Sequence, residues 1–484
     1  LKEPAILGHE LSLTVVSVGK NLSSHIKEGM RIGVQPDVYM DQVRYCIGVN
    51  VQGGFQKYMI LGKSVFYSDH GMTVFPIEKD ISHASIAQLE PNACVEAAYR
   101  PFSRKYFQSD KKLFIYIDEN VSSEFLFDMD LHHKETFAYG PVEVLKDSIM
   151  QFDKVLDLNE FKKLNGDIDD LLVVGNPEKN TMEELIQMLS IDSVFCWMQE
   201  TPQAMNVPCD IAKIHYSRIN FVGCTSHKMT DAFDEIKNRI DLLPHGHLLI
   251  MGGAGAMGRI HTLRAILHPE GPDTIVVSAR GKDRLLTSVE DFQDLATKYH
   301  KKLYAVATNE SDWKEQLVKI APEGFDDVVV CAPGIDPVEK AVPFLRADGM
   351  LILFSGTKYG AITDLPIGNI ATHHGRINAS SGSTVEDEKA VLENIYKERI
   401  DLDKNVVAVA GFNAVKDAIL AVSEGKYAGK VIVYPQLDRL PLVSVKDIEK
   451  VNVKLGEEVN TFGWSYQVEQ TLMNTFKTGG EDNE

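Results

Sequence analysis

Hydrophobic and polar residues follow different patterns in the two ends of the chain. In residues 5–100, short apolar runs of β type alternate with turns that contain glycine, as in LTVVSVG, MRIGVQ, GGFQKYMIL and GMTVFPI. From about residue 246, apolar strands alternate with helical stretches, the strands being HLLIM, TIVVSA, KLYAVAT, DDVVVCA and MLILFSG. The first pattern predicts an all-β region, and the second predicts βαβ units around a parallel sheet. A strand-like pattern returns in GKVIVYPQLDRLPLVSVKDIEKV, before a last helical segment, SYQVEQTLMNTF.

The middle of the chain contains a degenerate internal repeat. Residues 167–198, with the run DDLLVVGN, match residues 324–355, with the run DDVVVCAP. Residues 207–220 match residues 365–378, where Pro, His and an Arg-Ile-Asn triplet recur at one common spacing. We therefore expect residues from about 108 to 240 to form a second copy of the domain that follows. Its opening strand, KKLFIYI, runs into DENVSSEF without glycines, which predicts a role in packing or subunit contact.

Composition narrows the classes of protein that the chain can belong to. With 484 residues, it is long enough for about three domains, and its 44% hydrophobic and 25% charged residues are ordinary for a soluble globular protein. A net charge of −19 disfavours a general binder of nucleic acid or of acidic membranes. The six cysteines form no C-x-x-C pair, which suits a reducing cytoplasm and predicts neither a disulfide framework nor a zinc ribbon. We find no signal peptide and no apolar run of 18 residues, so secretion and membrane spanning are disfavoured.

A glycine-rich turn follows the first strand of the βαβ region. The segment GGAGAMG carries a G-x-G-x-x-G pattern at Gly253, Gly255 and Gly258, after the apolar residues 248–251 and before the helical run RIHTLRAIL. Such glycines allow a tight turn and a close approach to a pyrophosphate, whose charge rests on the helix N-terminus. The turn predicts dinucleotide binding; the alternative is a turn that serves only close packing of helix and strand.

The end of the next strand bears on which dinucleotide is bound. In TIVVSARGKDRL no carboxylate follows the strand at Ser278, whereas an NAD enzyme usually places one there for the ribose 2′-hydroxyl. Arg280, Lys282 and Arg284 cluster close by, and a guanidinium suits a 2′-phosphate. The pattern favours NADP(H) over NAD(H); the alternative is an ordinary solvated basic loop.

The order of these pieces resembles a known family, the zinc-dependent medium-chain dehydrogenase/reductases, which include alcohol and polyol dehydrogenases. The matching segments are GHE (8–10), GGFQKYMIL (53–61), LEPNACV (89–95), GGAGAMG (252–258) and GKYAGKVIVYP (425–435). Within the family, GAGAMGRIHTLRAI and WSYQVEQTLM resemble the sorbose-1-phosphate reductase-like branch of sugar-phosphate and polyol enzymes.

The resemblance implies an α/β plus β protein with a GroES-like β domain, a doubly wound Rossmann sheet and an extra degenerate Rossmann-like domain. A catalytic zinc would lie in the β domain, a nicotinamide cofactor on the Rossmann sheet, and the substrate between them. The expected segments are 1–100 for the GroES-like catalytic domain, 101–242 for the degenerate repeat, 243–400 for the nucleotide-binding domain, and 401–484 for the Rossmann edge and the C-terminal part of the catalytic domain. Because the chain begins with Leu1 instead of Met, we expect part of the first domain to precede it.

By the same resemblance, His9, Glu10 and Glu90 would be the catalytic and zinc-ligating residues. His and carboxylate ligands with an open position suit a catalytic zinc; the alternative for His9 and Glu10 is a surface pair. The family's first ligand, a cysteine, would lie upstream of the GHE segment. Only Cys46 occurs near residues 36–50, where the family's structural zinc lobe would fall, so we expect no structural zinc.

The remaining predicted contacts belong to the nicotinamide cofactor; the alternative for those at strand ends is ordinary turn chemistry. The predicted cofactor-binding residues are Gly253, Gly255, Ala256, Met257, Gly258, Ser278, Arg280, Arg284, Ala332, Pro333, Ser355, Gly356 and Ser380. Lys430 is expected to be structural or to face a phosphate.

Together these features predict a cytoplasmic zinc-dependent oxidoreductase. It would transfer a hydride between NADP(H) or NAD(H) and an alcohol or ketone group of a polyol, sugar or sugar phosphate. A zinc-free quinone or enone reductase of the same fold, and a catalytically inactive nucleotide-binding protein, stay open as alternatives. The expected partners are a small-molecule substrate and further copies of the chain in a dimer or tetramer, with no nucleic acid and no membrane.

Overall fold

The computed structural model describes residues 5–22, 25–41, 43–100, 104–129, 133–146, 152–161, 163–164 and 168–477. The chain divides into two compact units. The first contains Leu1–Ala97, Ala254–Ile260 and Gly382–Glu484, and the second contains Ala98–Gly253 and His261–Ser381. The four segments expected from the sequence stay a prediction. Within the described residues, no helix has both the length and the apolar character needed to cross a membrane.

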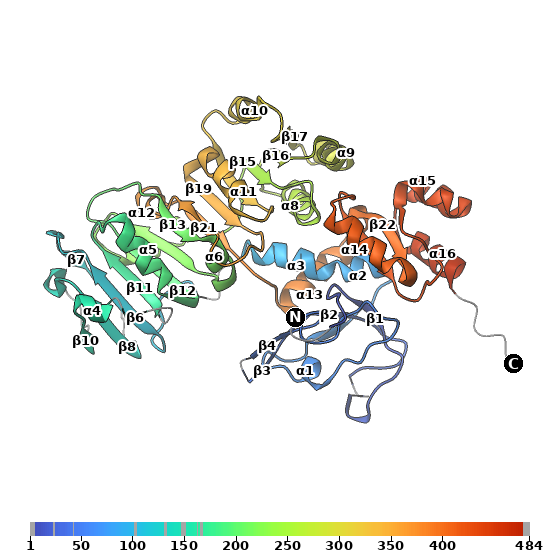
Figure 1. Cartoon of the computed structure of the whole chain (residues 1–484), viewed down its shortest axis with the longest axis horizontal. Helices are drawn as coiled ribbons and strands as arrows, with labels where there is room; N and C mark the ends of the chain where they lie inside the picture. Colours follow the sequence, from blue (N-terminus) through green and yellow to red (C-terminus); the bar gives the residue numbers. More distant parts are fainter. Residues whose placement is uncertain are drawn as a thin grey trace. The chain divides into compact units, whose positions relative to one another are not determined.

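The second unit holds two six-stranded parallel sheets (Figure 1). The strands of one, in chain order, are β6 (Lys112–Ile117), β8 (Glu135–Tyr139), β10 (Lys154–Val155), β11 (Ile168–Val174), β12 (Leu189–Met198) and β14 (Asn220–Cys224). Those of the other are β15 (His247–Met251), β16 (Thr274–Ala279), β17 (Lys302–Ala307), β18 (Phe325–Val330), β19 (Leu345–Leu353) and β21 (Arg376–Ala379).

Both sheets have the same topology, which confirms the Rossmann-like repeat. The orders are β10-β8-β6-β11-β12-β14 and β17-β16-β15-β18-β19-β21, each with the first strand in the middle and the chain reversing beside it. This is the doubly wound order in which nucleotides bind where the strand order reverses. Strands buried on both faces need continuous apolar runs, and the runs found in the sequence from residue 246 onward all form strands.

In the described part of the chain, the helices that connect the strands differ between the two sheets in number and in length. Those associated with the second sheet are α8 (Ala256–Leu267), α9 (Lys282–Lys298), α10 (Trp313–Ile320), α11 (Ile335–Ala341) and α12 (Gly368–His373). Those associated with the first are α4 (Leu158–Phe161), α5 (Lys179–Gln187), α6 (Ile211–Ser217) and α7 (Met229–Ala232), and the longest of these, α5, has nine residues. Between β6 and β8 the described residues contain the short strand β7 (Phe125–Leu126), which pairs with β9 (Leu145–Lys146), and no helix.

The two sheets meet along a pair of short strands from corresponding places in the repeat. Strand β13 (Val207–Asp210) pairs antiparallel with β20 (Ile362–Leu365), and Val207 lies opposite Leu365. These two residues correspond when the repeats are aligned, so the contact has the form of a two-fold interface between copies. A single hydrophobic core continues across it, including Phe221 of β14 and Ile377 of β21.

A buried ion pair recurs in both sheets. Its aspartate lies on the strand beside the first strand, β11 in one sheet and β18 in the other. Arg104 donates to a carboxylate oxygen of Asp170, and Arg239 donates to Oδ1 of Asp327 at 2.5 Å. The other oxygen of each carboxylate accepts from a backbone N–H, at 3.0 Å in the first copy and 2.8 Å in the second. The repeat is thus retained in its polar contacts as well as in its strand order.

The first unit contains the antiparallel strands expected of a GroES-like region. Its strands here are β1 (Ser12–Thr14), β2 (Arg31–Val34) and β5 (Val74–Pro76) in one sheet, and β3 (Asp37–Met40) with β4 (Val43–Cys46) in a hairpin. Their shared core includes Ile32, Val38 and Val74. The later part adds β22 (Val406–Gly411), β23 (Lys430–Tyr434) and β24 (Val443–Ser444). The helices are α1 (Lys63–Phe66), α2 (His83–Ala87), α3 (Leu89–Ala97), α13 (Val385–Tyr396), α14 (Val415–Ser423), α15 (Val453–Phe462) and α16 (Tyr466–Phe476).

Two expectations for residues 5–100 were wrong. The region is not all β, because α2 and α3 occupy its last part; Ser82 caps α2 by accepting from the backbone N–H of Ser85. Residues 53–61 form no strand, because the backbone N–H groups of Gly53 and Phe55 bond to the carbonyls of Ile6 and Leu7 in an irregular loop contact.

Candidate functional site

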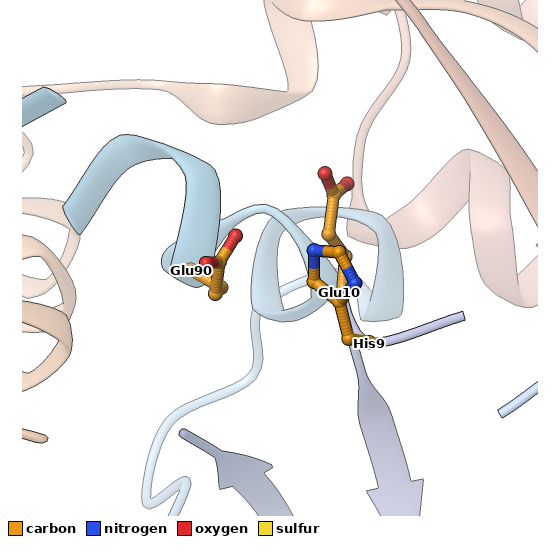
Figure 2. A group of neighbouring side chains, drawn as sticks. All are labelled: His9, Glu10 and Glu90. Carbon is orange, nitrogen blue, oxygen red and sulfur yellow. The ribbon is translucent and has the colours of Figure 1, made fainter. Parts of the chain in front are cut away.

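His9, Glu10 and Glu90 come together in the first unit, although they lie far apart in sequence. One ligand atom from each side chain lies within 4.8 Å of the others, and all three residues are half-buried. Figure 2 shows His9 and Glu10 on the segment that enters β1, with the Glu90 carboxylate on α3 facing the His9 ring. The structure therefore brings together all three residues predicted to hold the metal.

The loop that carries His9 is held by the glycines of the GGFQ segment. Gly8 has a φ of +96°, and its carbonyl accepts from the N–H of Gly54 at 2.9 Å. A Cβ at Gly53 would lie 2.4 Å from the carbonyl oxygen of Gly8, so only glycine permits this close approach. The two motifs thus form one substructure, and the second supports the backbone beside the first.

Glu90 is fixed by its position on α3 and by a neighbouring thiol. The Sγ of Cys94, one helical turn further along, donates to Oε1 of Glu90 at 3.1 Å. Burial, followed by the negative charge of Glu10, raises the pKa of the Glu90 carboxyl, while His9 acts in the opposite direction. A cation placed between these side chains would stabilise the ionised form of Glu90.

Lys430 is the nearest cationic side chain to this group. Its Nζ donates to both oxygens of Glu10, at 2.6 and 2.8 Å, and the residue itself is only 9% exposed. The sequence pointed to a structural or phosphate-facing lysine, and nothing in the pattern paired it with a residue so distant. Cys94 could have been found from its helical spacing to Glu90, but Lys430 carried no such signal.

The donor set fits a divalent cation of the zinc type. An imidazole nitrogen and carboxylate oxygens are ordinary zinc ligands, and three protein ligands leave a position open for water or substrate. Glu10 divides its charge between this position and Lys430, whereas the hydrogen-bond donor that the described residues give to Glu90 is the weak thiol of Cys94. His9 and Glu90 would therefore be the principal ligands, and Glu10 the third.

The glycine turn has the geometry that a nucleotide-binding turn needs. Gly252 and Gly253 both donate their N–H to the carbonyl of Ser278, at 2.8 and 2.9 Å, which joins the turn to β16. Gly252 has a φ of +85°, and a Cβ there would lie 2.7 Å from the Cβ of Ala332. Helix α8 begins at Ala256 and offers the N–H groups of its first turn.

The other predicted cofactor contacts lie at the ends of the second sheet's strands. Ser278 is buried, and its hydroxyl donates to the carbonyl of Val306, so this residue holds the turn through its own carbonyl. Arg280 follows β16 and is exposed, and Arg284 is half-buried in the first turn of α9. Gly356 lies beside the hydroxyl of Tyr216, which would be 3.0 Å from a Cβ at this position. The residues that make up the rest of the predicted set are Gly255, Met257, Gly258, Pro333, Ser355 and Ser380, and their contact with a cofactor stays a prediction.

Comparisons with known proteins give distant relatives. No protein-family model matches the chain. It is 27% identical over 195 residues to L-sorbose 1-phosphate reductase of Klebsiella pneumoniae, which covers 39% of the chain and 47% of that protein. It is 24% identical over 243 residues to mannitol-1-phosphate 5-dehydrogenase of Aliivibrio fischeri, which covers 47% of the chain and 56% of that protein. The chain thus spans about half the length of these curated relatives.

The solved structures that align with the chain include a butanediol dehydrogenase. The structure of 2R,3R-butanediol dehydrogenase from Bacillus subtilis aligns over 89% of the chain and 81% of its own length, with 13% identity and a TM-score of 0.47. The two curated relatives are a reductase and a dehydrogenase of sugar or polyol phosphates, and the chain is similar to each over about half of that protein's length.

Proposed function

We propose that the chain is an NAD(P)-dependent oxidoreductase that uses zinc to act on the alcohol or carbonyl group of a polyol, sugar or sugar phosphate. The observation that carries the proposal is the convergence of His9, Glu10 and Glu90, whose donor atoms lie within 4.8 Å of one another. Surface His-Glu pairs are common, but a second carboxylate from a separate helix, half-buried beside the same imidazole, supports a metal site here.

The chain's own side chains would keep this site in the geometry for binding. Cys94 donates to one oxygen of Glu90 and leaves the other oxygen to the cation. Lys430 holds the Glu10 carboxylate in place and offsets part of the site's negative charge. Zinc bound here would act as a Lewis acid on the oxygen of the substrate.

The nucleotide would lie on the second six-stranded sheet, at the glycine turn that follows β15. The turn at residues 252–258 and the N-terminus of α8 would hold the pyrophosphate. The basic residues after β16 favour NADP(H), because a guanidinium binds a 2′-phosphate through charge-assisted hydrogen bonds, and NAD(H) is the second choice. The acidic turn of the first sheet offers no comparable site.

The test combines metal analysis with turnover on a substrate panel. The purified chain should contain close to one equivalent of zinc, and His9→Ala should lose most of it. His25→Ala is the matched control, because His25 is exposed and lies in the same unit. The panel begins with hexitol and ketose 1-phosphates, for which the two sequence relatives are named, and each is assayed with NADP(H) and NAD(H) in both directions.

The outcomes separate the alternatives. Equal zinc content in His9→Ala and His25→Ala would remove the metal assignment, and turnover of enones or quinones without zinc would favour the zinc-free reductase. Binding of NADPH with no turnover on any substrate, by a zinc-loaded protein, would favour the inactive nucleotide-binding protein.

A further inference from the structure

A small cavity in the second unit, away from the glycine turn, is lined by a buried arginine that forms no ion pair with any carboxylate among the described residues. The cavity has a volume of about 140 Å³. It lies at the starts of strands β14 and β21, beside the loop at residues 233–240. Arg376, at the start of β21, is 2% exposed and lines it. No ion pair links Arg376 to a carboxylate in the part of the chain that the structure describes.

The hydrogen bonds of Arg376 leave part of its guanidinium unused. Nη1 donates to the carbonyl of Phe221 at 2.5 Å, and Nη2 donates to Oδ1 of Asn220 at 3.2 Å. The buried Nε has no partner among the described residues. Neutral acceptors satisfy some of the donors, but they supply no countercharge, and an unpaired buried charge is costly.

The internal repeat shows what has been lost at this place. Arg218 corresponds to Arg376, and it donates to both oxygens of Asp192 at 2.7 Å. In the strand register Met350 corresponds to Val194, and it lies opposite Arg376 on the neighbouring strand, where it is fully buried. Arg218 is the left-handed residue that ends α6, whereas Arg376 already lies in a strand, so its side chain is enclosed. Of the two triplet arginines, Arg218 has a carboxylate partner, whereas Arg376 has the thioether of Met350 on the neighbouring strand.

The remaining charges around the cavity are balanced among themselves. Arg239 pairs with Asp327, and Lys105 pairs with Glu235 at 3.1 Å, on the exposed rim. Tyr106 also donates to Glu235, at 2.7 Å. Burial, followed by the charge of Arg239, lowers the pKa of Arg376 to about 10, which still leaves the guanidinium charged at neutral pH. The cavity therefore has an excess positive charge at its buried end.

We propose that this cavity binds a small oxyanion of the phosphate class, which supplies the countercharge that Arg376 lacks. A phosphate oxygen accepting from the guanidinium of Arg376 would supply this countercharge, and the rim lysine could turn from Glu235 to a second oxygen. The phosphate comes either as the free ion or as the end of a phosphate monoester. The site is separate from the metal group and the glycine turn, and it joins a strand of each sheet copy through Asn220 and Arg376.

The test is a titration of the full chain with inorganic phosphate and with glycerol 3-phosphate, at constant ionic strength against chloride. Calorimetry gives the dissociation constant, and thermal unfolding gives the ligand-dependent rise in Tm. Arg376→Met should weaken binding by roughly tenfold or more, because it removes a charged hydrogen-bond donor. Lys105→Ala, on the exposed rim, should weaken it by a smaller factor and cannot be explained by misfolding. Tighter binding of inorganic phosphate would identify the free ion as the ligand. Tighter binding of glycerol 3-phosphate would identify a phosphate monoester.

Arg280→Ala separates this site from the nucleotide turn. Phosphate that binds beside β16 would be lost in Arg280→Ala and kept in Arg376→Met, and that result would overturn the proposal. Absence of any phosphate-dependent heat or Tm shift in the parent chain at millimolar concentration would overturn it as well.

Discussion

In the first sheet of the second unit, β6 runs into an acidic segment, residues 118–120, whereas in the second sheet β15 runs into the glycines of residues 252–258 and then into α8. The two sheets otherwise share their strand order and a buried arginine–aspartate pair. The carboxylate of Asp118 accepts from the N–H of Asn120 at 2.8 Å, so a side-chain carboxylate, and not a ligand, satisfies this backbone donor of the turn. The comparison separates the residues that form the sheet from the residues that form the nucleotide-binding turn.

The sheet frame depends on apolar strands and on a few buried polar contacts, and both copies keep them. Nucleotide binding depends on one turn without side chains and on the helix behind it, and only the second copy keeps these. A fold can therefore be retained after its ligand-binding turn has changed.

The largest expected effect concerns the shared ion pairs. Arg239→Ala leaves Asp327 buried without its cation and should cost about 3–5 kcal/mol of unfolding free energy. Arg104→Ala should cost less, because Asp170 keeps His133, whose Nε2 lies 2.9 Å from Oδ2. Urea unfolding followed by tryptophan fluorescence measures both, with Trp197 in the first sheet and Trp313 beside the second. Equal losses would show that the histidine gives no compensation.

The next prediction concerns Asp403, which lies outside both sheets. It shows whether a change of stability with pH arises in the sheets or at this residue. Burial raises the pKa of Asp403 to about 7, although Ser82 and Ser85 donate to the carboxylate. The folded state then binds a proton more tightly than the unfolded state, so stability is complete below about pH 4 and falls as the pH rises to about 7, by at most about 1.4 kcal/mol per pH unit. Asp403→Asn should flatten this part of the stability profile, and an unchanged profile would assign the titration elsewhere.

A smaller effect tests the difference between the two turns. In Gly253→Ala the new Cβ would lie 2.4 Å from Cγ1 of Val277, so we expect a loss of about 1–3 kcal/mol and weaker binding of NADPH. Asn120→Ala, at the exposed turn of the first sheet, is the matched change and should leave NADPH binding as it is. NADPH fluorescence titration measures both; an effect of Asn120→Ala would give the first sheet a role in binding.

The smallest effect sharpens the choice of cofactor on the second sheet. Arg280→Ala should weaken NADP(H) by about tenfold relative to NAD(H), because the exposed guanidinium contributes about 1.4 kcal/mol to a 2′-phosphate contact. Parallel titrations with the two cofactors give the ratio. Equal weakening of both would mean that Arg280 contacts a group common to them.

The sequence was sufficient for those features that depend on local patterns. Apolar runs identified the strands of the second sheet, and the recurring Arg-Ile-Asn triplet identified the repeat. It also brought His9, Glu10 and Glu90 together, but through resemblance and not through spacing. It failed where long-range packing decides: residues 53–61 became a loop because they approach the backbone at Gly8, and no local pattern pairs Lys430 with Glu10. The cofactor contacts, the homo-oligomer and the cytoplasmic location stay predictions.

The antiparallel pairing of β13 with β20 has one more consequence. In an association of two identical chains, every substitution at a two-fold contact appears on both sides of it, and dilution can separate the halves. Here the halves are covalently joined, so dilution does not part them, and each can change alone. The turn after the first strand could be acidic in one half while the other half kept its glycines.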